Sequence, residues 1–243
     1  MQLVAMGAQD VFLTGNPQIT FFKVVYRRHT NFSKECISQE FNGNPDLGKP
    51  VTCTLARNGD LVQEIYLKAT VGGANSNADL NNLIRSVEVE IGGQKIDKHY
   101  AAWLDIYNEL FEHNIDYLGL MTRGTSSGGD VFIPLRFWFN RNAGLALPLI
   151  ALQYHEVKIL VEINDTTNLK GSNMSASNMS LLVNYVYLDT DERRRFAQVS
   201  HEYLIEQVQH TGVETINSGA NAAGRVDMNF NHPVKALFWT TDG

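Results

Sequence analysis

Residues 131–163, with the sequence VFIPLRFWFNRNAGLALPLIALQYHEVKILVEI, decide the fold class of this chain. Apolar side chains alternate with other residues over 131–139 and again over 157–163. The alternating apolar positions are Val131, Ile133, Leu135, Phe137 and Phe139, then Val157, Ile159, Val161 and Ile163. A period of two places such side chains on one face of an extended chain. We therefore predict two half-buried strands that flank a connection, 141–153, as in a two-sheet β-sandwich.

Further alternating runs lie on both sides of this stretch. They cover residues 31–41, 51–55, 61–71, 86–91 and 181–189. The pair Asn58-Gly59 separates two of these runs and predicts a tight β-hairpin, because both residues tolerate positive φ. Gly92-Gly93 predicts a second turn, whereas the composition of 43–50, 72–82, 124–130 and 165–178 predicts loops.

Two helices interrupt the strand pattern. Residues 100–112 carry a stripe with helical spacing, which we expect to pack on the barrel as core over about three turns. The stripe consists of Trp103, Ile106, Tyr107, Leu110 and Phe111. Thr190 is the predicted N-cap of a second, short helix, DERRRFAQ (191–198).

These elements predict an all-β fold: an antiparallel jelly-roll sandwich of about eight strands with inserted short helices. Residues 19–28 (ITFFKVVYRR) are compatible with a strand or a short buried helix. A break in composition near Ser200 marks a domain boundary. Beyond it, HEYLIEQVQ (201–209) and VKALFW (234–239) again resemble strands.

Composition excludes several classes of protein. The chain has 243 residues and a formal net charge of -6, so we expect no basic surface and no direct sequence-specific nucleic-acid binding. No apolar run is long enough to span a bilayer. The first residues lack the pattern of a secretory signal, so we expect a reducing compartment, with Cys36 and Cys53 as free, buried thiols.

The sequence offers no recognisable chemistry. The seven histidines are scattered without metal-ligand spacing, and no nucleophile or phosphate-binding motif is present. Two distant carboxylates could still assemble a glycosidase site, and Glu88 and Glu90 are expected on a solvent face. We predict no catalytic, cofactor-binding or metal-ligating residues and no cofactor. A carbohydrate-binding or carbohydrate-cleaving jelly roll, with an exposed aromatic platform or carboxylate pair, is the alternative from another class.

Several segments in order along the chain resemble the major capsid protein of nucleocytoplasmic large DNA viruses, closest to the algal, chlorella-virus-like type. They are GAQDVFLTGNPQITFFKVVYRRHTNF (7–32), RNGDL (57–61), EIGGQKIDKHY (90–100), GLALPLIALQYHEVK (144–158), LDTDERRRFAQ (188–198), HEYLIEQ (201–207) and NHPVK (231–235). The resemblance covers essentially the whole chain.

The resemblance implies two consecutive jelly rolls and trimeric, pseudo-hexagonal capsomers that tile an icosahedral shell. Residues 1–30 would then be an N-terminal arm facing the particle interior, 31–199 the first jelly roll, and 200–243 a linker and the start of a truncated second one. The implied partners are other copies of the chain, neighbouring capsomers, minor capsid proteins and a nearby internal membrane. The implied location is the virion capsid, assembled in the host cytoplasm.

Some details stay open in the sequence. N-x-S/T triplets begin at Asn31, Asn164, Asn173 and Asn178; loops of related capsids can carry glycans, but without a secretory signal chance occurrence in polar loops is the better interpretation here. Residues 201–243 are too few to close a barrel, which needs about 100–200 residues per domain. We therefore expect a fragment of a longer protein, in preference to a minor or vertex capsid protein with one jelly roll. The outer face of 132–138 (Phe132, Pro134 and Trp138) either forms a contact between copies or is covered by the helix at 100–112.

Overall fold

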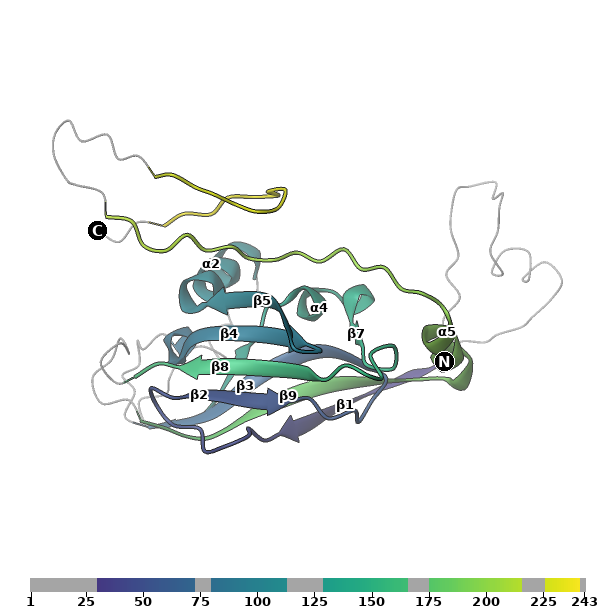
Figure 1. Ribbon diagram of the computed structural model, residues 1–243. Coiled ribbons are helices and arrows are strands. Elements are labelled where there is room, and N and C mark those ends of the chain that lie inside the picture. The colour runs from purple at the N-terminus through teal and green to yellow at the C-terminus, as the bar shows by residue number, and fades with distance from the viewer. Residues whose placement is uncertain (1–29, 73–79, 113–128, 166–174, 216–225, 241–243) are drawn as a thin grey trace.

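The computed structural model describes residues 30–72, 80–112, 129–165, 175–215 and 226–240. The run at 19–28 and much of the 72–82, 124–130 and 165–178 segments lie outside the described residues. Within them, two antiparallel sheets face each other (Figure 1). The strands are β1 (Phe32–Gln39), β2 (Pro50–Thr54), β3 (Leu61–Gly72), β4 (Ile84–Ile91), β5 (Gln94–Tyr100), β6 (Gly129–Pro134), β7 (Leu147–Pro148), β8 (Val157–Ile163) and β9 (Ser175–Leu188).

The strand order confirms the predicted jelly roll. One sheet runs β1-β9-β3-β6, with the two-residue β7 also paired to β3, and the other runs β2-β8-β4-β5. Except for the β4–β5 hairpin, neighbours in each sheet come from distant parts of the sequence; β1 pairs with β9, for example, and β2 with β8. The apolar faces of both sheets meet in one core. The alternation predicted for β8 is confirmed, because Val157, Ile159, Val161 and Ile163 are all buried there.

The strand predicted over 131–139 is wrong in its second half. β6 ends at Pro134, and a short helix, α4 (Trp138–Arg141), follows. Phe137, Trp138 and Phe139 are all buried, and three consecutive buried side chains do not fit a strand with one exposed face. The side chain of Asn140 fixes this turn: its Oδ1 accepts the Phe137 N–H at 3.1 Å and its Nδ2 donates to the Gln63 carbonyl at 2.6 Å.

The hairpin predicted at Asn58-Gly59 is also wrong. The flanking strands belong to different sheets, so the chain crosses from β2 to β3 instead of pairing them. Arg57 holds this crossing by donating to the carbonyls of Leu152, at 2.7 Å, and His155, at 3.2 Å. Gly59 has no positive φ; its small size matters because a Cβ there would lie 2.8 Å from Tyr185 Cβ.

Gly59→Ala is therefore expected to destabilise the barrel. The added methyl group would meet the fully buried Tyr185, whose hydroxyl donates to the Ala56 carbonyl at 2.7 Å. Overpacking of this kind costs about 1–3 kcal/mol, which urea unfolding would measure. Gly144→Ala is the matched control, since its Cβ would meet only Asn142 Oδ1, at 3.4 Å. Equal midpoints for the two variants would contradict the role given to Gly59.

Other turns and strand ends refine the sequence-based boundaries. The Gly92-Gly93 turn is confirmed between β4 and β5, with φ of 59° and 83°. A register shift between Val62 and Ile65 places Val62 in the main core and Leu61 in a small cluster with Ala146 and Val186, so Leu61 does not share the face predicted for it. β9 begins at Ser175, inside the segment predicted to be a loop.

The two cysteines are free, as expected, but they differ in environment. Cys53 is fully buried, and burial raises the pKa of its thiol to about 11. Cys36 lies on β1, the exposed edge strand, so the expectation that both are buried is wrong for this residue.

The two longer helices lie at opposite ends of the described barrel (Figure 1). α2 (Ala101–Phe111) follows β5 directly, and α5 (Thr190–Gln198) follows β9. The N-cap of α5 is Asp189 rather than Thr190, because the Asp189 carboxylate accepts the Thr190 N–H at 2.7 Å. None of the helices in the described ranges is long and apolar enough to cross a bilayer.

Candidate assembly interface

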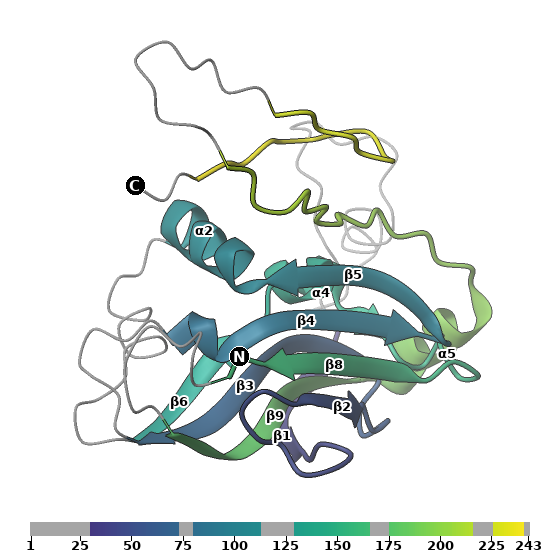
Figure 2. The same ribbon diagram turned by 60° about the vertical axis from the view of Figure 1, so that its left-hand side comes forward.

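After α5 the chain runs back over the barrel in an extended conformation, along β5 and α2 (Figure 2). The strands predicted at 201–209 and 234–239 do not form, since neither stretch joins a sheet in the described structure. Contacts with the barrel instead involve side chains. Gln207 donates to the Ile96 carbonyl, and the Val208 N–H donates to Asp97 Oδ1 at 3.0 Å. The segment thus lies beside β5, which is the last strand of its sheet.

Asp97 joins this segment to the barrel interior. Its Oδ1 also accepts the Lys98 N–H at 2.9 Å, and its Oδ2 lies 2.8 Å from His99 Nε2. Both side chains are fully buried, although the angle of the Asp97–His99 contact is not that of a well-formed hydrogen bond. The His99 ring stacks on Phe137, with 4.6 Å between centroids. A buried carboxylate therefore connects β5, the core and residue 208.

A charged chain makes the second connection. Arg141, at the end of α4, pairs with Glu206 at 2.9 Å, and Glu206 also pairs with Lys235. The hydrogen bond from Lys235 is the main reason that the pKa of Glu206 lies below its usual value, and the positive charge of Arg141 acts in the same direction. We call residues 199–215 and 226–240 the C-terminal segment. Glu206 joins its two parts to the barrel, because Arg141 belongs to α4 and Lys235 to the second part.

The aromatic stripe of α2 makes the third connection, and its predicted role as core is wrong. Leu104 and Asn108 are the buried residues of the helix, whereas Leu110 and Phe111 are 52% and 49% exposed. The rings form a ladder outside the barrel: Trp103–Tyr107 at 5.9 Å, Tyr107–Phe111 at 4.9 Å and Trp103–Phe238 at 5.2 Å. Arg136 and Arg141 each lie 5.2 Å from the Tyr107 ring, a cation–π distance.

We expect the contact of residues 203–208 with the barrel to weaken in acid. The pKa of Glu206 is lowered in the docked state, so its ion pairs stabilise docking fully above the usual glutamate pKa, about 4.3. This stabilisation is lost as the pH falls through the lowered pKa. After correction for the intrinsic pH dependence of exchange, the Val208 amide should then be less protected at about pH 3 to 4 than at neutral pH. In Glu206→Gln, that loss should be absent. A full loss in this variant would assign the effect to another group.

The C-terminal segment exposes several large apolar side chains among its polar ones. Leu204, Val213 and Trp239 are 85%, 94% and 82% exposed, although Phe238 packs on α2. Isolated exposed apolar residues are ordinary, but these lie on both described stretches that follow α5, residues 199–215 and 226–240. The segment thus has one side bound to the barrel and another that offers apolar side chains to a further layer.

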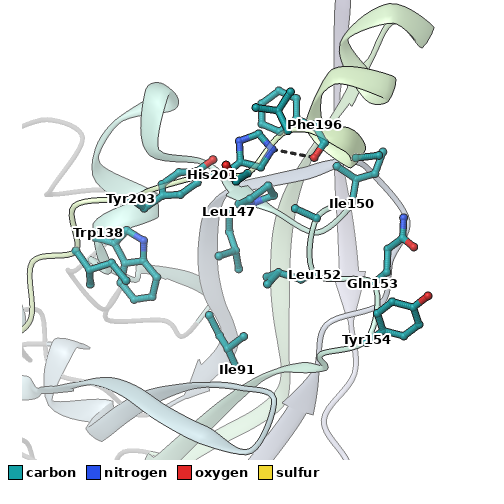
Figure 3. A pocket seen from close by; sticks show the side chains of 16 residues that line it. Ile91, Trp138, Leu147, Ile150, Leu152, Gln153, Tyr154, Phe196, His201 and Tyr203 are labelled. Atoms are coloured by element: carbon teal, nitrogen blue, oxygen red, sulfur yellow. Dashed lines mark hydrogen bonds between the residues drawn. The ribbon is translucent and has the colours of Figure 1, made fainter.

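An apolar groove lies between the segment and the barrel, on the side of α5 (Figure 3). It has a volume of about 490 Å³. Its lining includes Trp138, Leu147, Ile150, Leu152, Phe196 and Tyr203. Trp138 is 2% exposed and Pro134 is buried as well, so the proposed contact between copies through the outer face of 132–138 is not available at these residues.

The described residues offer little for catalysis or sugar binding. They contain no group of three or more His, Cys, Asp and Glu side chains that could hold a metal ion. Glu88, expected on a solvent face, is 7% exposed and pairs with Lys95 at 3.0 Å, and Glu162 accepts from the Ser86 hydroxyl at 2.6 Å. An exposed aromatic platform for a sugar would draw on the three tryptophans, of which Trp138 is buried and Trp103 packs on Phe238, whereas Trp239 is exposed.

Glycosylation triplets differ in access. Asn31 and Asn178 are exposed, whereas Asn164 is 9% exposed and donates to the Asn82 carbonyl at 2.8 Å. Asn173 lies outside the described residues.

Comparison with known proteins agrees with this architecture. A family model described as "Major capsid protein N-terminus" matches residues 20–189, and one described as "Large eukaryotic DNA virus major capsid protein" matches residues 192–242. The chain belongs to the major capsid protein family of large eukaryotic DNA viruses. A major capsid protein of Pyramimonas orientalis virus is 58% identical over 98% of this chain and 64% of its own length.

A further relative and a solved structure support this family assignment, by sequence identity and by fold respectively. The major capsid protein of Paramecium bursaria Chlorella virus 1 is 45% identical over 98% of this chain and 59% of its own. A solved structure of the PBCV-1 capsid matches with a TM-score of 0.74 at 42% identity, over 88% of this chain and 57% of that one. This capsid chain therefore spans less than two thirds of the length of these relatives.

The contacts that dock the C-terminal segment of this capsid protein were not predicted from the sequence. Asp97 and Glu206 look like ordinary charges of a strand and a polar segment, and their partners lie 111 and 65 residues away. The α2 stripe was a usable signal, because an aromatic face on a helix needs a cover. The prediction placed that cover in the barrel, whereas Phe238 supplies part of it.

Proposed function

We propose that this chain provides the first jelly-roll domain of a major capsid protein and the beginning of a second, and that three copies form a capsomer of the icosahedral shell. The domains would be the arm at 1–30, the barrel at 31–199 and the following segment at 200–243. The observation that carries the proposal is the C-terminal segment, which is fixed to the barrel through Asp97 and Arg141 and leaves large apolar side chains exposed. Further strands packed there would bury Leu204 and Trp239.

The role is structural, since rigidity and complementary surfaces are what a shell requires. A barrel whose strands are paired in two sheets has few free edges, which limits unwanted pairing between copies. Contacts around a three-fold axis are heterologous and must close into a ring. Other copies, neighbouring capsomers and minor capsid proteins are the proposed partners, with an internal membrane near the arm and glycans on outer loops. Assembly would take place in the host cytoplasm, without enzymatic turnover.

The test is the mass in solution of the protein encoded by the complete reading frame, measured by light scattering during size exclusion. A mass of three chains, with pseudo-hexagonal particles in electron micrographs, is the expected result. A protein that remains monomeric at high concentration would refute the capsomer. Acrylamide quenching of Trp239, isolated by replacing every other tryptophan with Phe, should be strong in the 243-residue chain and weak in the complete protein.

A further inference from the structure

The groove beside α5 is lined by two apolar walls that have no occupant among the described residues (Figure 3). One wall comes from residues 147–154 and the other from residues 196–205, and Ile91 and Trp138 also line the groove. Hydrogen-bond donors and acceptors are few there: the His201 ring bonds the Phe196 carbonyl at 2.8 Å and Tyr203 reaches the Ala146 carbonyl at 3.5 Å. The open surface therefore suits apolar or aromatic side chains.

We propose that this groove binds the aromatic run ITFFKVVY, residues 19–26, of the same chain. This inference goes beyond the capsid role and concerns a single copy, so it does not depend on capsomer formation. The run contains Phe21, Phe22 and Tyr26, and it would bury a large apolar area on docking. The groove volume, about 490 Å³, falls in the range of about 300–1,000 Å³ typical of pockets that take a ligand with several rings.

The length of the connecting chain permits this contact. The described structure places Phe32, the first residue of β1, opposite Leu188, two residues before α5 begins. α5 has 9 residues and is about 14 Å long, at 1.5 Å per residue, and its last turn reaches the groove at Phe196. Residues 27–31, which link the run to β1, can span about 17 Å when extended, at about 3.3 Å per residue, slightly more than the length of α5. The run therefore reaches the groove without any change in the barrel.

The tether also favours the chain's own run over that of a second copy. A short linker gives a local concentration on the order of millimolar, well above that of a second chain in dilute solution. Tyr154, which is 93% exposed at the groove rim, and Val199, which is 54% exposed, would be covered by the docked run.

Photo-crosslinking tests the occupant directly. A benzophenone amino acid replaces Gln153 at the groove rim, and in a control it replaces Ser177, at the far end of β9. The expected crosslinks from position 153 fall within residues 19–26, and those from position 177 do not. In an equal mixture of ¹⁵N-labelled and unlabelled chains, the crosslinked peptides should be wholly light or wholly heavy. Mixed pairs would assign the groove to a second copy, and crosslinks elsewhere would overturn the proposal.

Proteolysis gives an independent measure. Ala151 is exposed in the groove, so Ala151→Trp fills the groove without disturbing the core. Tryptic cleavage after Lys23, Arg27 and Arg28 should then become at least about tenfold faster than in the unmodified chain. Ala102→Trp, on the exposed side of α2, should leave the rate unchanged.

Phe22→Ser changes the run and leaves the groove intact, so it should give the same acceleration as Ala151→Trp. Circular dichroism confirms that each variant is folded. Equal cleavage rates in the unmodified chain, Ala151→Trp and Phe22→Ser would show that the run is not docked.

Discussion

Replacing Phe137 with alanine is expected to lower the free energy of unfolding by about 3–5 kcal/mol, the usual cost of removing a fully buried aromatic ring. Phe137 is fully buried and stacks between His99, at 4.6 Å, and Phe139, at 5.8 Å. It is also the N-cap of α4, the turn that replaces the second half of the predicted strand. A cavity there would remove packing contacts from the core and the ring that stacks on the buried His99.

Urea unfolding followed by circular dichroism measures this loss. Phe32→Ala makes the same chemical change at a side chain that is 62% exposed, so its effect should stay within about 0.5 kcal/mol. Similar losses for the two variants would mean that the stacked position of Phe137 does not contribute as described.

Asp97→Ala has the second large expected effect, because it changes both stability and the position of the C-terminal segment. The variant removes the acceptor of the Lys98 and Val208 N–H groups and the carboxylate that lies 2.8 Å from His99 Nε2. Leaving buried polar groups without partners costs about 1–3 kcal/mol each. We expect lower stability and, below the unfolding transition, faster hydrogen exchange at Val208.

Two variants separate the contributions of Asp97. Asp97→Asn keeps an oxygen that can accept from Val208, so it should retain more protection of that amide than alanine does. Asp46→Ala removes an exposed carboxylate that pairs with Lys49 and should unfold close to the unmodified chain. If Asp97→Ala leaves the Val208 exchange rate unchanged, the segment is held by other contacts.

Periodicity predicted the fold well where one face of a strand is buried and the other is exposed. β8, and β3 from Ile65 onward, match their patterns for this reason, and the glycine pair at 92–93 marks a turn that requires positive φ. Local sequence failed at the chain crossings. Asn58-Gly59 has the composition of a hairpin, but the pairing of β2 with β8 decides which sheet each strand joins.

The interface was harder to predict than the barrel because its energy comes from contacts between distant residues. The α2 stripe has helical spacing whether its cover is the barrel or another segment, so spacing cannot identify the cover. Asp97 stands between Ile96 and Lys98 in a polar strand sequence, QKIDKHY (94–100), yet it is buried with Val208 and His99 beside it. The role of this carboxylate in binding residue 208 can be recognised only from the folded structure.

The position of residues 203–208 beside β5 has a consequence for synthesis on the ribosome. A barrel that has just folded exposes the free side of β5, and nascent capsid chains on one polysome are close enough for such edges to pair wrongly. The next part of the chain to leave the exit tunnel is the part that covers this edge. Because it binds through Gln207 and the Asp97 carboxylate rather than through a full ladder, we expect it to shield the edge as soon as it emerges while making few contacts with the strand.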